Sequence, residues 1–409
     1  MSISVRSFAK INLGLRIGAL RSDGFHELRT VYQTIALHDV ISVSIGRGSG
    51  IEIRCDDPRV PVDSTNTCYR IVDRAMQALN ARGRVIIEIE KRLPVQGGLG
   101  GASGNAVAAL IALEKALGKE LSGADKLRIA AEVGSDLPLF LIGGTVLGVG
   151  RGEEVYPLPD LPSMPCVVVT PEIAVSTPKA FADWDRLCGA GAPARERQLQ
   201  DRKVRDREPE GHQRDRRHRE GTASSRAQTA QQEYRALAPE GLAEFRSART
   251  GVDAGPHTVA ADSGSLLHSK LTPSTHSDRM VQFSREISAW LSAGPEQVGR
   301  RRSGVSAKAK SGGRAEPLQL DLVRTGIEND FERVVFPQHP ELRKVKSVLE
   351  RAGARYASLS GSGSAIYGLF DSREKAVVAA KKLNQNGTAA VATSTLTQRQ
   401  YWRRLQISD

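Results

Sequence analysis

The most informative segment of the chain is Leu93-Pro94-Val95-Gln96-Gly97-Gly98-Leu99-Gly100-Gly101-Ala102-Ser103-Gly104-Asn105, a glycine-rich run between a predicted strand and a predicted helix. The strand is indicated by the β-branched content of residues 85–89, and the helix by the apolar segment 106–117. Backbone N–H groups of small residues can close on phosphate oxygens, and a helix N-terminus adds unpaired donors and partial positive charge. The run therefore predicts a phosphate-binding loop.

This loop matches neither common nucleotide-binding motif. The pattern G-x-G-x-x-G fails because Ser103 stands where the last glycine is required. The pattern G-x-x-x-x-G-K-[ST] fails because Gly118-Lys119 is followed by Glu120 and lacks the leading glycine. Taken alone, an ordinary glycine-rich turn before a helix explains the loop as well as a phosphate site does.

Four further motifs accompany the loop in a fixed order along the chain. They are SFAKINL at 7–13, SDGFHEL at 22–28, GSDLPLF at 134–140 and SGSGS at 360–364. Together with the loop they resemble the GHMP kinase superfamily, and residues 175–178 (VSTP) and 329–332 (NDFE) look like further landmarks of it. The resemblance covers roughly residues 3–187 and 266–370.

This resemblance implies an α+β fold of two lobes, a ribosomal-protein-S5-domain-2-like N-terminal lobe and a ferredoxin-like C-terminal lobe. We expect an N-terminal ATP-binding domain at residues 1–160 and a C-terminal domain at 161–187 and 265–400. Residues 188–264 are expected to be a low-complexity, disordered insert, because polar and charged residues dominate there and little apolar surface is available to offset the ordering entropy. A natural insert and an out-of-frame coding stretch both explain this segment.

Local patterns predict further elements. Residues 280–291 carry apolar side chains at helical spacing, and another helix is predicted from Pro340 to a stop at Gly353. Asp371 and Glu374 have the spacing of a capping box at the start of a later helix. Near the N-terminus, Asn66 and Thr67 are candidate caps of an amphipathic helix.

The branch of the superfamily that the motifs match most closely contains ATP-dependent kinases of the non-mevalonate isoprenoid pathway, which phosphorylate the 2-hydroxyl of a methylerythritol linked to cytidine diphosphate. Such a transfer requires an oriented hydroxyl, an acceptor for its proton and stabilisation of the transferring group. The resemblance implies that Asp136 is the base and that Lys10 lies beside it, countering negative charge. From the residues alone, Lys10 would be a solvated charge at a strand end and Asp136 a helix cap.

The resemblance also implies ATP as the cofactor, with Mg²⁺ carried by the nucleotide and no separate metal site on the protein. The ATP-binding residues that it implies are Pro94, Val95, Gln96, Gly97, Gly98, Leu99, Gly100, Gly101, Ala102, Ser103 and Gly104. The loop departs from the family pattern GLGGGSSDA at Ala102, Gly104 and Asn105. The backbone cradle survives because it needs N–H groups, whereas the lost hydroxyl and carboxylate bear on nucleotide affinity and metal handling.

Recognition of cytidine calls for an aromatic face and directional hydrogen-bonding groups. Phe25, His26 and Phe181 match the family positions for this pocket, with Phe25 in place of the usual tyrosine. Asn12 and Thr177 are expected to contact the methylerythritol or the phosphate part. Taken singly, each aromatic residue is more often core than ligand contact, and a lone histidine is more often structural.

The net charge of +12 is unevenly distributed along the chain. Residues 195–314 hold 23 Lys/Arg and 15 Asp/Glu, a surplus of +8, which leaves +4 for the rest. This window is mixed in sign and of low complexity, whereas a nucleic-acid surface would need clustered basic residues with interleaved aromatics. We therefore expect no nucleic-acid partner.

The four cysteines, at positions 55, 68, 166 and 188, form no metal-binding pattern, and the first residues lack the apolar core of a signal peptide. The longest apolar run, residues 137–150, is shorter than the roughly 20 residues of a membrane span. We expect a cytoplasmic enzyme, monomeric or weakly dimeric, whose partners are ATP and a small-molecule substrate and which does not bind a membrane.

Two alternatives remain open. The chain could be a GHMP kinase for another small alcohol such as homoserine or mevalonate, although Phe25-His26 after Asp23-Gly24 argues against this. It could also be a catalytically impaired nucleotide-binding homologue, given the loop departures and the interrupted middle of the chain.

Overall fold

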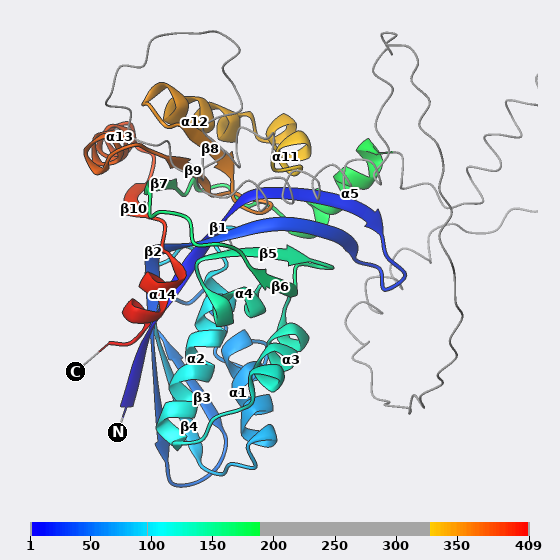
Figure 1. Cartoon of the computed structure of the whole chain (residues 1–409), viewed down its shortest axis with the longest axis vertical. Helices are drawn as coiled ribbons and strands as arrows, with labels where there is room; N and C mark the ends of the chain where they lie inside the picture. Colours follow the sequence, from blue (N-terminus) through cyan, green and yellow to red (C-terminus); the bar gives the residue numbers. More distant parts are fainter. Residues whose placement is uncertain (1, 96, 189–327, 408–409) are drawn as a thin grey trace, which may run out of the picture. The chain divides into compact units, whose positions relative to one another are not determined.

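The described part of the chain is built around two β-sheets. Figure 1 shows the computed structural model, which describes residues 2–95, 97–188 and 328–407. The helix predicted at 280–291 and the expected insert beyond Cys188 lie outside the described residues. Among the described residues, no helix combines the length and apolar character that a membrane crossing requires.

The first sheet has six strands, and its frame is the long antiparallel hairpin of β1 (Ser2–Leu20) and β2 (His26–Gly46). The strand order is β3-β4-β2-β5-β6, with β1 also paired to β2. The remaining strands are β3 (Ile51–Cys55), β4 (Arg84–Glu90), β5 (Thr145–Val149) and β6 (Glu154–Pro157). Only the pair β3–β4 is parallel among these described strands.

Four helices accompany this sheet (Figure 1): α1 (Thr67–Ala78), α2 (Gly101–Leu117), α3 (Gly123–Val133) and α4 (Leu137–Ile142). Every residue of α2 from Gly104 to Glu114 is buried. A helix that is apolar on all sides belongs in the centre of a core, and α2 packs against β1, β2 and α1. The helix that follows the glycine-rich loop is therefore the central helix of the first lobe.

The second sheet is antiparallel, with the order β10-β7-β9-β8. Its strands are β7 (Pro165–Val169), β8 (Tyr356–Leu359), β9 (Ile366–Leu369) and β10 (Ala390–Ser394). The helices α11 (Glu332–Gln338), α12 (Pro340–Arg351) and α13 (Arg373–Gln385) lie on this side of the molecule (Figure 1), with α12 against β8 and β9. Two further helices are α5 (Thr177–Leu187) and α14 (Gln398–Leu405).

An apolar cluster joins the two sheets. It contains Ile11 and Leu13 from β1 together with Cys166, Tyr367 and Leu369 from the second sheet. The Tyr367 hydroxyl also donates a hydrogen bond of 2.8 Å to the backbone oxygen of Asn12. The middle of β1 is consequently held from both lobes, and this is the part of the strand that carries Lys10 and Asn12.

The structure confirms several local predictions and corrects two. Asn66 caps α1 by accepting a hydrogen bond from the Cys68 amide, and α12 spans 340–351 as expected. The helix expected to begin at Ala106 begins at Gly101, because small residues of the loop already take helical geometry. The capping box at Asp371 was wrong: Ser372 caps α13, and the Asp371 carboxylate accepts from Arg355 instead.

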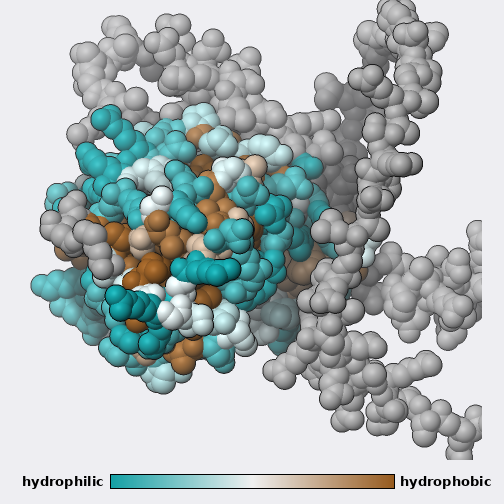
Figure 2. Space-filling model, turned by 90° about the horizontal axis from the view of Figure 1, so that it is seen from below, coloured by the Kyte–Doolittle hydropathy of each residue, from teal (hydrophilic) through white to brown (hydrophobic). Residues whose placement is uncertain are grey.

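The surface mixes polar and apolar side chains. Figure 2 shows a face on which apolar residues gather near the middle and hydrophilic residues surround them. Large apolar side chains that are well exposed include Phe25, Leu127 and Trp402.

Candidate active site

Lys10 and Asp136 lie together beside the glycine-rich loop, as the sequence predicts for a catalytic pair. The Lys10 ammonium is 3.5 Å from Asp136 Oδ2 and donates a 2.7 Å hydrogen bond to Asn12 Oδ1. Lys10 is 3% exposed, so it is not a solvated residue at a strand end. Asp136 occupies the cap position before α4 without capping it, and its side chain is 34% exposed. The carboxylate is thus held by a buried cation and open to a substrate.

Tyr32 is a third member of this cluster that the sequence reasoning missed. Its hydroxyl donates a 3.0 Å hydrogen bond to Asp136 Oδ1, and its ring lies 5.7 Å from the Lys10 ammonium. Burial, reinforced by the Asp136 charge, raises the pKa of Tyr32 well above its usual value of 10, so the hydroxyl remains a donor at neutral pH. Tyr32 faces Asn12 across the β1–β2 ladder, but that pairing is visible only once the register is known.

The glycine-rich loop borders a cleft of about 330 Å³. The predicted ATP-binding residues that line it are Pro94, Val95, Gly97, Gly98, Leu99, Gly100, Gly101, Ala102 and Ser103. Gln96 lies outside the described residues, and Gly104 is buried and does not line the cleft. Because α2 begins at Gly101, its first amide groups lack intrahelical acceptors at this position, which suits an anionic ligand. Lys91 also lines the cleft, where its ammonium is 2.6 Å from Asp39 Oδ2.

Two glycines of the loop are required by close approach. A Cβ on Gly100, whose φ is +69°, would lie 2.9 Å from Lys10 Cγ and 3.0 Å from Phe140 Cζ. A Cβ on Gly98, whose φ is +73°, would collide with the backbone oxygen of Ser360. The amide of Lys10 additionally donates a 2.9 Å hydrogen bond to Leu99 O. The loop therefore lies directly against the strand that carries Lys10.

The structure gives a physical reason for one departure from the family loop. A Cβ on Gly104 would lie 2.9 Å from Phe8 O and 2.9 Å from Ser7 Oγ, so α2 approaches β1 too closely for a serine at this position. The Asn105 side chain is buried, lines the cleft, and leaves its Oδ1 without a hydrogen-bond partner. For Ala102 the structure offers no comparable reason.

The turn at 360–364 forms a wall of the site. Ser360 Oγ donates a 2.9 Å hydrogen bond to Gly98 O, and a Cβ on Gly361 would lie 3.5 Å from the Lys10 ammonium. Ser362 Oγ is 2.7 Å from Thr177 Oγ1, which places the predicted substrate residue Thr177 beside the turn. A tight turn alone would not explain these contacts, since they join the second lobe to the loop and to β1.

The predicted substrate residues His26 and Phe181 are in contact. Their rings stack with centroids 5.1 Å apart and an interplanar angle of 3°. His26 Nδ1 lies 3.2 Å from Gly18 O, and because a carbonyl only accepts, Nδ1 carries the hydrogen. His26 Nε2 lies 3.3 Å from Asp185 Oδ1, a contact that the sequence reasoning missed. Asp185 follows Phe181 by one helical turn on α5, and this spacing could have indicated it.

Phe25 and Asn12 differ in how far they are available to a ligand. Phe25 is 48% exposed, and the Arg151 guanidinium lies 5.0 Å from the centre of its ring. Asn12 is buried, with Oδ1 bound by Lys10 and Nδ2 donating a 2.7 Å hydrogen bond to Thr30 Oγ1. The contacts of Asn12 therefore orient the lysine, while the Phe25 ring offers an accessible aromatic surface.

Among the described residues, no cluster of three or more His, Cys, Asp or Glu side chains could hold a metal ion. Mg²⁺ that travels with a nucleotide is bound mainly by phosphate oxygens and waters and takes few protein ligands. The unpaired Oδ1 of Asn105 is the oxygen beside the loop whose chemistry fits such a role.

Comparisons with known proteins agree with this geometry. The model for the GHMP kinases N-terminal domain matches residues 66–144, and the model for the GHMP kinases C-terminal domain matches residues 316–389. A 4-diphosphocytidyl-2-C-methyl-D-erythritol kinase of Solibacter usitatus is 31% identical over 401 residues, which covers 98% of this chain and 92% of that protein. One from Acaryochloris marina is 29% identical over 381 residues, covering 93% and 91%.

A solved structure is also similar along most of the chain. The crystal structure of a 4-(cytidine 5'-diphospho)-2C-methyl-D-erythritol kinase matches with a TM-score of 0.56 and 25% identity, covering 96% of this chain and 99% of that one. With the two domain matches, this confirms the predicted two-lobed α+β fold.

Proposed function

Because this chain belongs to the 4-diphosphocytidyl-2-C-methyl-D-erythritol kinases of the GHMP superfamily, we propose that it uses ATP to phosphorylate the 2-hydroxyl of 4-diphosphocytidyl-2-C-methyl-D-erythritol. This is a step of the non-mevalonate route to isoprenoid precursors. The observation that carries the proposal is the Lys10–Asp136 pair, held at 3.5 Å between the glycine-rich loop and the 360–364 turn.

The chemistry assigned to this pair is a transfer to an alcohol. The 2-hydroxyl oxygen attacks the γ-phosphorus of ATP, the bond between that phosphorus and the β–γ bridging oxygen breaks, and ADP leaves. Asp136 accepts the hydroxyl proton, since its carboxylate is partly exposed beside the loop. Lys10 counters charge on the transferring group, and Tyr32 and Lys10 together fix the carboxylate through its two oxygens.

The nucleotide site in this proposal is the cleft bordered by the loop. The triphosphate lies against the backbone of residues 97–103 at the start of α2, where helix amides and the helix dipole favour an anion. The ion that accompanies the nucleotide, Mg²⁺, would neutralise phosphate charge when bound, and Asn105 Oδ1 is available to it or to its water.

The acceptor site in this proposal extends from Asp136 to the aromatic residues at the end of the hairpin. Thr177 contacts the methylerythritol or phosphate part, while Asn12 acts chiefly by holding Lys10. Phe25, His26 and Phe181 form the cytidine pocket, in which Phe25 supplies an exposed ring for stacking. The exposed aromatic surface beside polar groups supports this assignment.

The same proposal includes the organisation of the chain. Residues 1–160 constitute the ATP-binding domain, and 161–187 with 265–400 the C-terminal domain, separated by an insert at 188–264. The enzyme acts in the cytoplasm as a monomer or weak dimer on small molecules, without nucleic acid or membrane.

The test is a steady-state assay of ADP release with purified full-length protein. We expect turnover with ATP and 4-diphosphocytidyl-2-C-methyl-D-erythritol, and none with homoserine or mevalonate as acceptor. Asp136→Asn should lower kcat by at least about a hundredfold, as expected for loss of a general base. The matched control is Asp160→Asn. It changes a carboxylate of the same lobe whose Oδ1 accepts a hydrogen bond from the backbone amide of Gln398. Wild-type turnover by the Asp136→Asn enzyme would exclude the catalytic assignment.

A further inference from the structure

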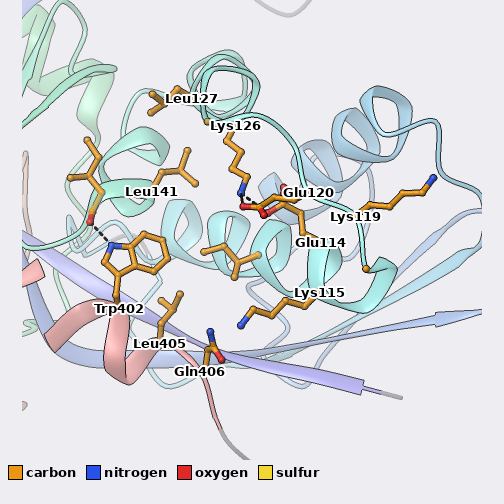
Figure 3. A pocket seen from close by; sticks show the side chains of 14 residues that line it. Glu114, Lys115, Lys119, Glu120, Lys126, Leu127, Leu141, Trp402, Leu405 and Gln406 are labelled. Carbon is orange, nitrogen blue, oxygen red and sulfur yellow. Dashed lines mark hydrogen bonds and ion pairs between the residues drawn. The ribbon is translucent and has the colours of Figure 1, made fainter. Parts of the chain in front are cut away.

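A cavity of about 600 Å³ lies outside the candidate active site. It is formed where the second half of α2 meets the start of α3, the end of α4 and the helix α14, and Figure 3 shows the side chains that line it. Its volume is within the range of small-molecule sites and exceeds that of the nucleotide cleft. The reaction proposed above makes no use of it.

One side of the cavity is apolar. Trp402, Leu405 and Leu141 lie together on this side in Figure 3, and Leu127 lies near them. Trp402 and Leu127 are 40% and 39% exposed, so this side of the cavity presents apolar surface to water. An apolar ligand would remove this surface from water.

The charged side chains of the cavity are unequally compensated. Lys126 is neutralised by Glu114 at 3.0 Å and by Glu120 at 2.7 Å. Lys115 and Lys119 also line the cavity, and neither forms an ion pair with any residue of the described ranges. The Lys119 ammonium donates a 3.4 Å hydrogen bond to Leu79 O, whereas Figure 3 shows Lys115 extending along α2 toward Gln406. Lys115 is therefore a cation beside the apolar wall with no carboxylate partner among the described residues.

We propose that this cavity binds an amphipathic small molecule with an apolar body and one anionic group. The body lies against Trp402 and Leu127, and the anion pairs with Lys115. Charge complementarity commits the site to an anion, because the carboxylates of the cavity are already used by Lys126.

The cavity is also connected to the active site through the two helices that border both. The helix α2 begins at the glycine-rich loop and α4 begins directly after Asp136, while the far ends of both helices line the cavity. Trp402 Nε1 donates a 2.9 Å hydrogen bond to Ile142 O, and the Tyr401 hydroxyl donates one of 2.7 Å to Phe140 O. The Phe140 ring in turn packs against Gly100 of the loop, where an added Cβ would lie 3.0 Å from Phe140 Cζ. A ligand that moves Trp402 acts on α4 and on the loop, so its occupancy should alter the KM for ATP.

The test uses the anionic probe 8-anilinonaphthalene-1-sulfonate and its uncharged counterpart N-phenyl-1-naphthylamine, with ATP saturating so that the nucleotide cleft is filled. Fluorescence titration of the full-length protein should show that Lys115→Gln weakens sulfonate binding about threefold to fivefold and leaves the neutral probe within twofold. Trp402→Ala should weaken both probes about tenfold. Lys344→Gln, an exposed lysine of α12, is the matched control and should change neither.

The proposal fails if, with ATP saturating, Lys115→Gln and Trp402→Ala bind the sulfonate as the wild type does. It also fails in its anionic part if Lys115→Gln weakens the two probes equally. The coupling is measured as the KM for ATP with and without saturating sulfonate. A change of at least twofold that disappears in Trp402→Ala supports it, and an unchanged KM in the wild type overturns it.

Discussion

Replacing Tyr32 by phenylalanine isolates the hydrogen bond that the hydroxyl donates to Asp136 Oδ1. The change removes one oxygen atom and leaves the ring in place beside the Lys10 ammonium. The ring itself is tightly enclosed, since a Cβ on Gly148 would lie 2.5 Å from Tyr32 Cε2. The packing of the core is therefore expected to be retained in Tyr32→Phe.

The expected magnitude follows from the surroundings of the carboxylate. A hydrogen bond to a charged group contributes about 1.5–3 kcal/mol. Because the Asp136 side chain is 34% exposed and keeps Lys10 as a partner, water can replace part of the lost contact. We expect the lower end, about 1.5 kcal/mol, which corresponds to roughly a tenfold decrease in kcat.

The assay is steady-state ADP release with both substrates varied, together with a thermal unfolding curve. Tyr32→Phe should lower kcat about tenfold while each KM remains within about twofold, because the tyrosine orients the base and is not assigned to substrate binding. Tyr156→Phe changes a residue of β6 that is 53% exposed; this variant is the control and should have wild-type kcat. Since the pKa of Tyr32 lies well above 10, its own deprotonation should not affect the rate below that pH.

A Tyr32→Phe enzyme with wild-type kcat would refute the positioning role. A decrease in kcat accompanied by a large fall in the unfolding temperature would equally contradict it, because the effect would then come from packing.

Three further outcomes follow from the same geometry. Gly104→Ser should lower the free energy of unfolding by about 1–3 kcal/mol in chemical denaturation, because the new Cβ meets Phe8 O. Adding Ser7→Ala should recover part of this loss, because it removes the second obstruction. Stability equal to wild type would show that α2 can shift away from β1. Asp185→Asn should raise the KM for the cytidine substrate about fivefold, because it releases His26. The control is Asp183→Asn on the same helix, where Asp183 contacts Lys179 and Gln338, and it should leave this KM unchanged. Equal KM values for the two variants would contradict the role of Asp185 in holding His26. Burial raises the pKa of Cys68 to about 12 and also raises that of Cys166, so neither thiol forms a thiolate near pH 8. Iodoacetamide labelling of the native protein, followed by mass spectrometry, should find both cysteines unmodified. Rapid labelling of either cysteine would disprove the burial argument.

The parts of the fold that were predictable from the sequence are those with strong local signals. The strand before the glycine-rich loop, the cap at Asn66 and the helix from Pro340 all follow from periodicity and capping residues. The start of α2 differs from the predicted one because Gly101 and Gly104 have poor intrinsic helix propensity. Their helical geometry is imposed by the packing of α2 against β1, which no local pattern reports.

The site residues differ in the same way, since some lie within local motifs and others reach the site only through tertiary structure. Lys10, Asp136 and the loop could be identified because each lies within a recognisable motif. Tyr32 and Asp185 could not, since each reaches the site through tertiary placement, one across the β1–β2 ladder and the other along α5. The substrate contact of Asn12 stays a prediction, and the hydrogen bonds of its amide with Lys10 and Thr30 are tertiary contacts that no local motif reports.

The short segment at 328–332 explains why the site requires both lobes. Leu15 N donates to Glu328 O at 3.0 Å, and Asp330 accepts from the amide of Ile17, so this segment extends along β1. Asn329 Nδ2 donates 2.8 Å hydrogen bonds to Leu359 O and Gly361 O, and thereby fixes the turn that contacts Gly98 and approaches Lys10. The first lobe supplies the loop, the lysine and the aspartate, but the wall that confines them depends on residues far later in the chain. The wall of the proposed site therefore depends on residues 328–332 lying along β1.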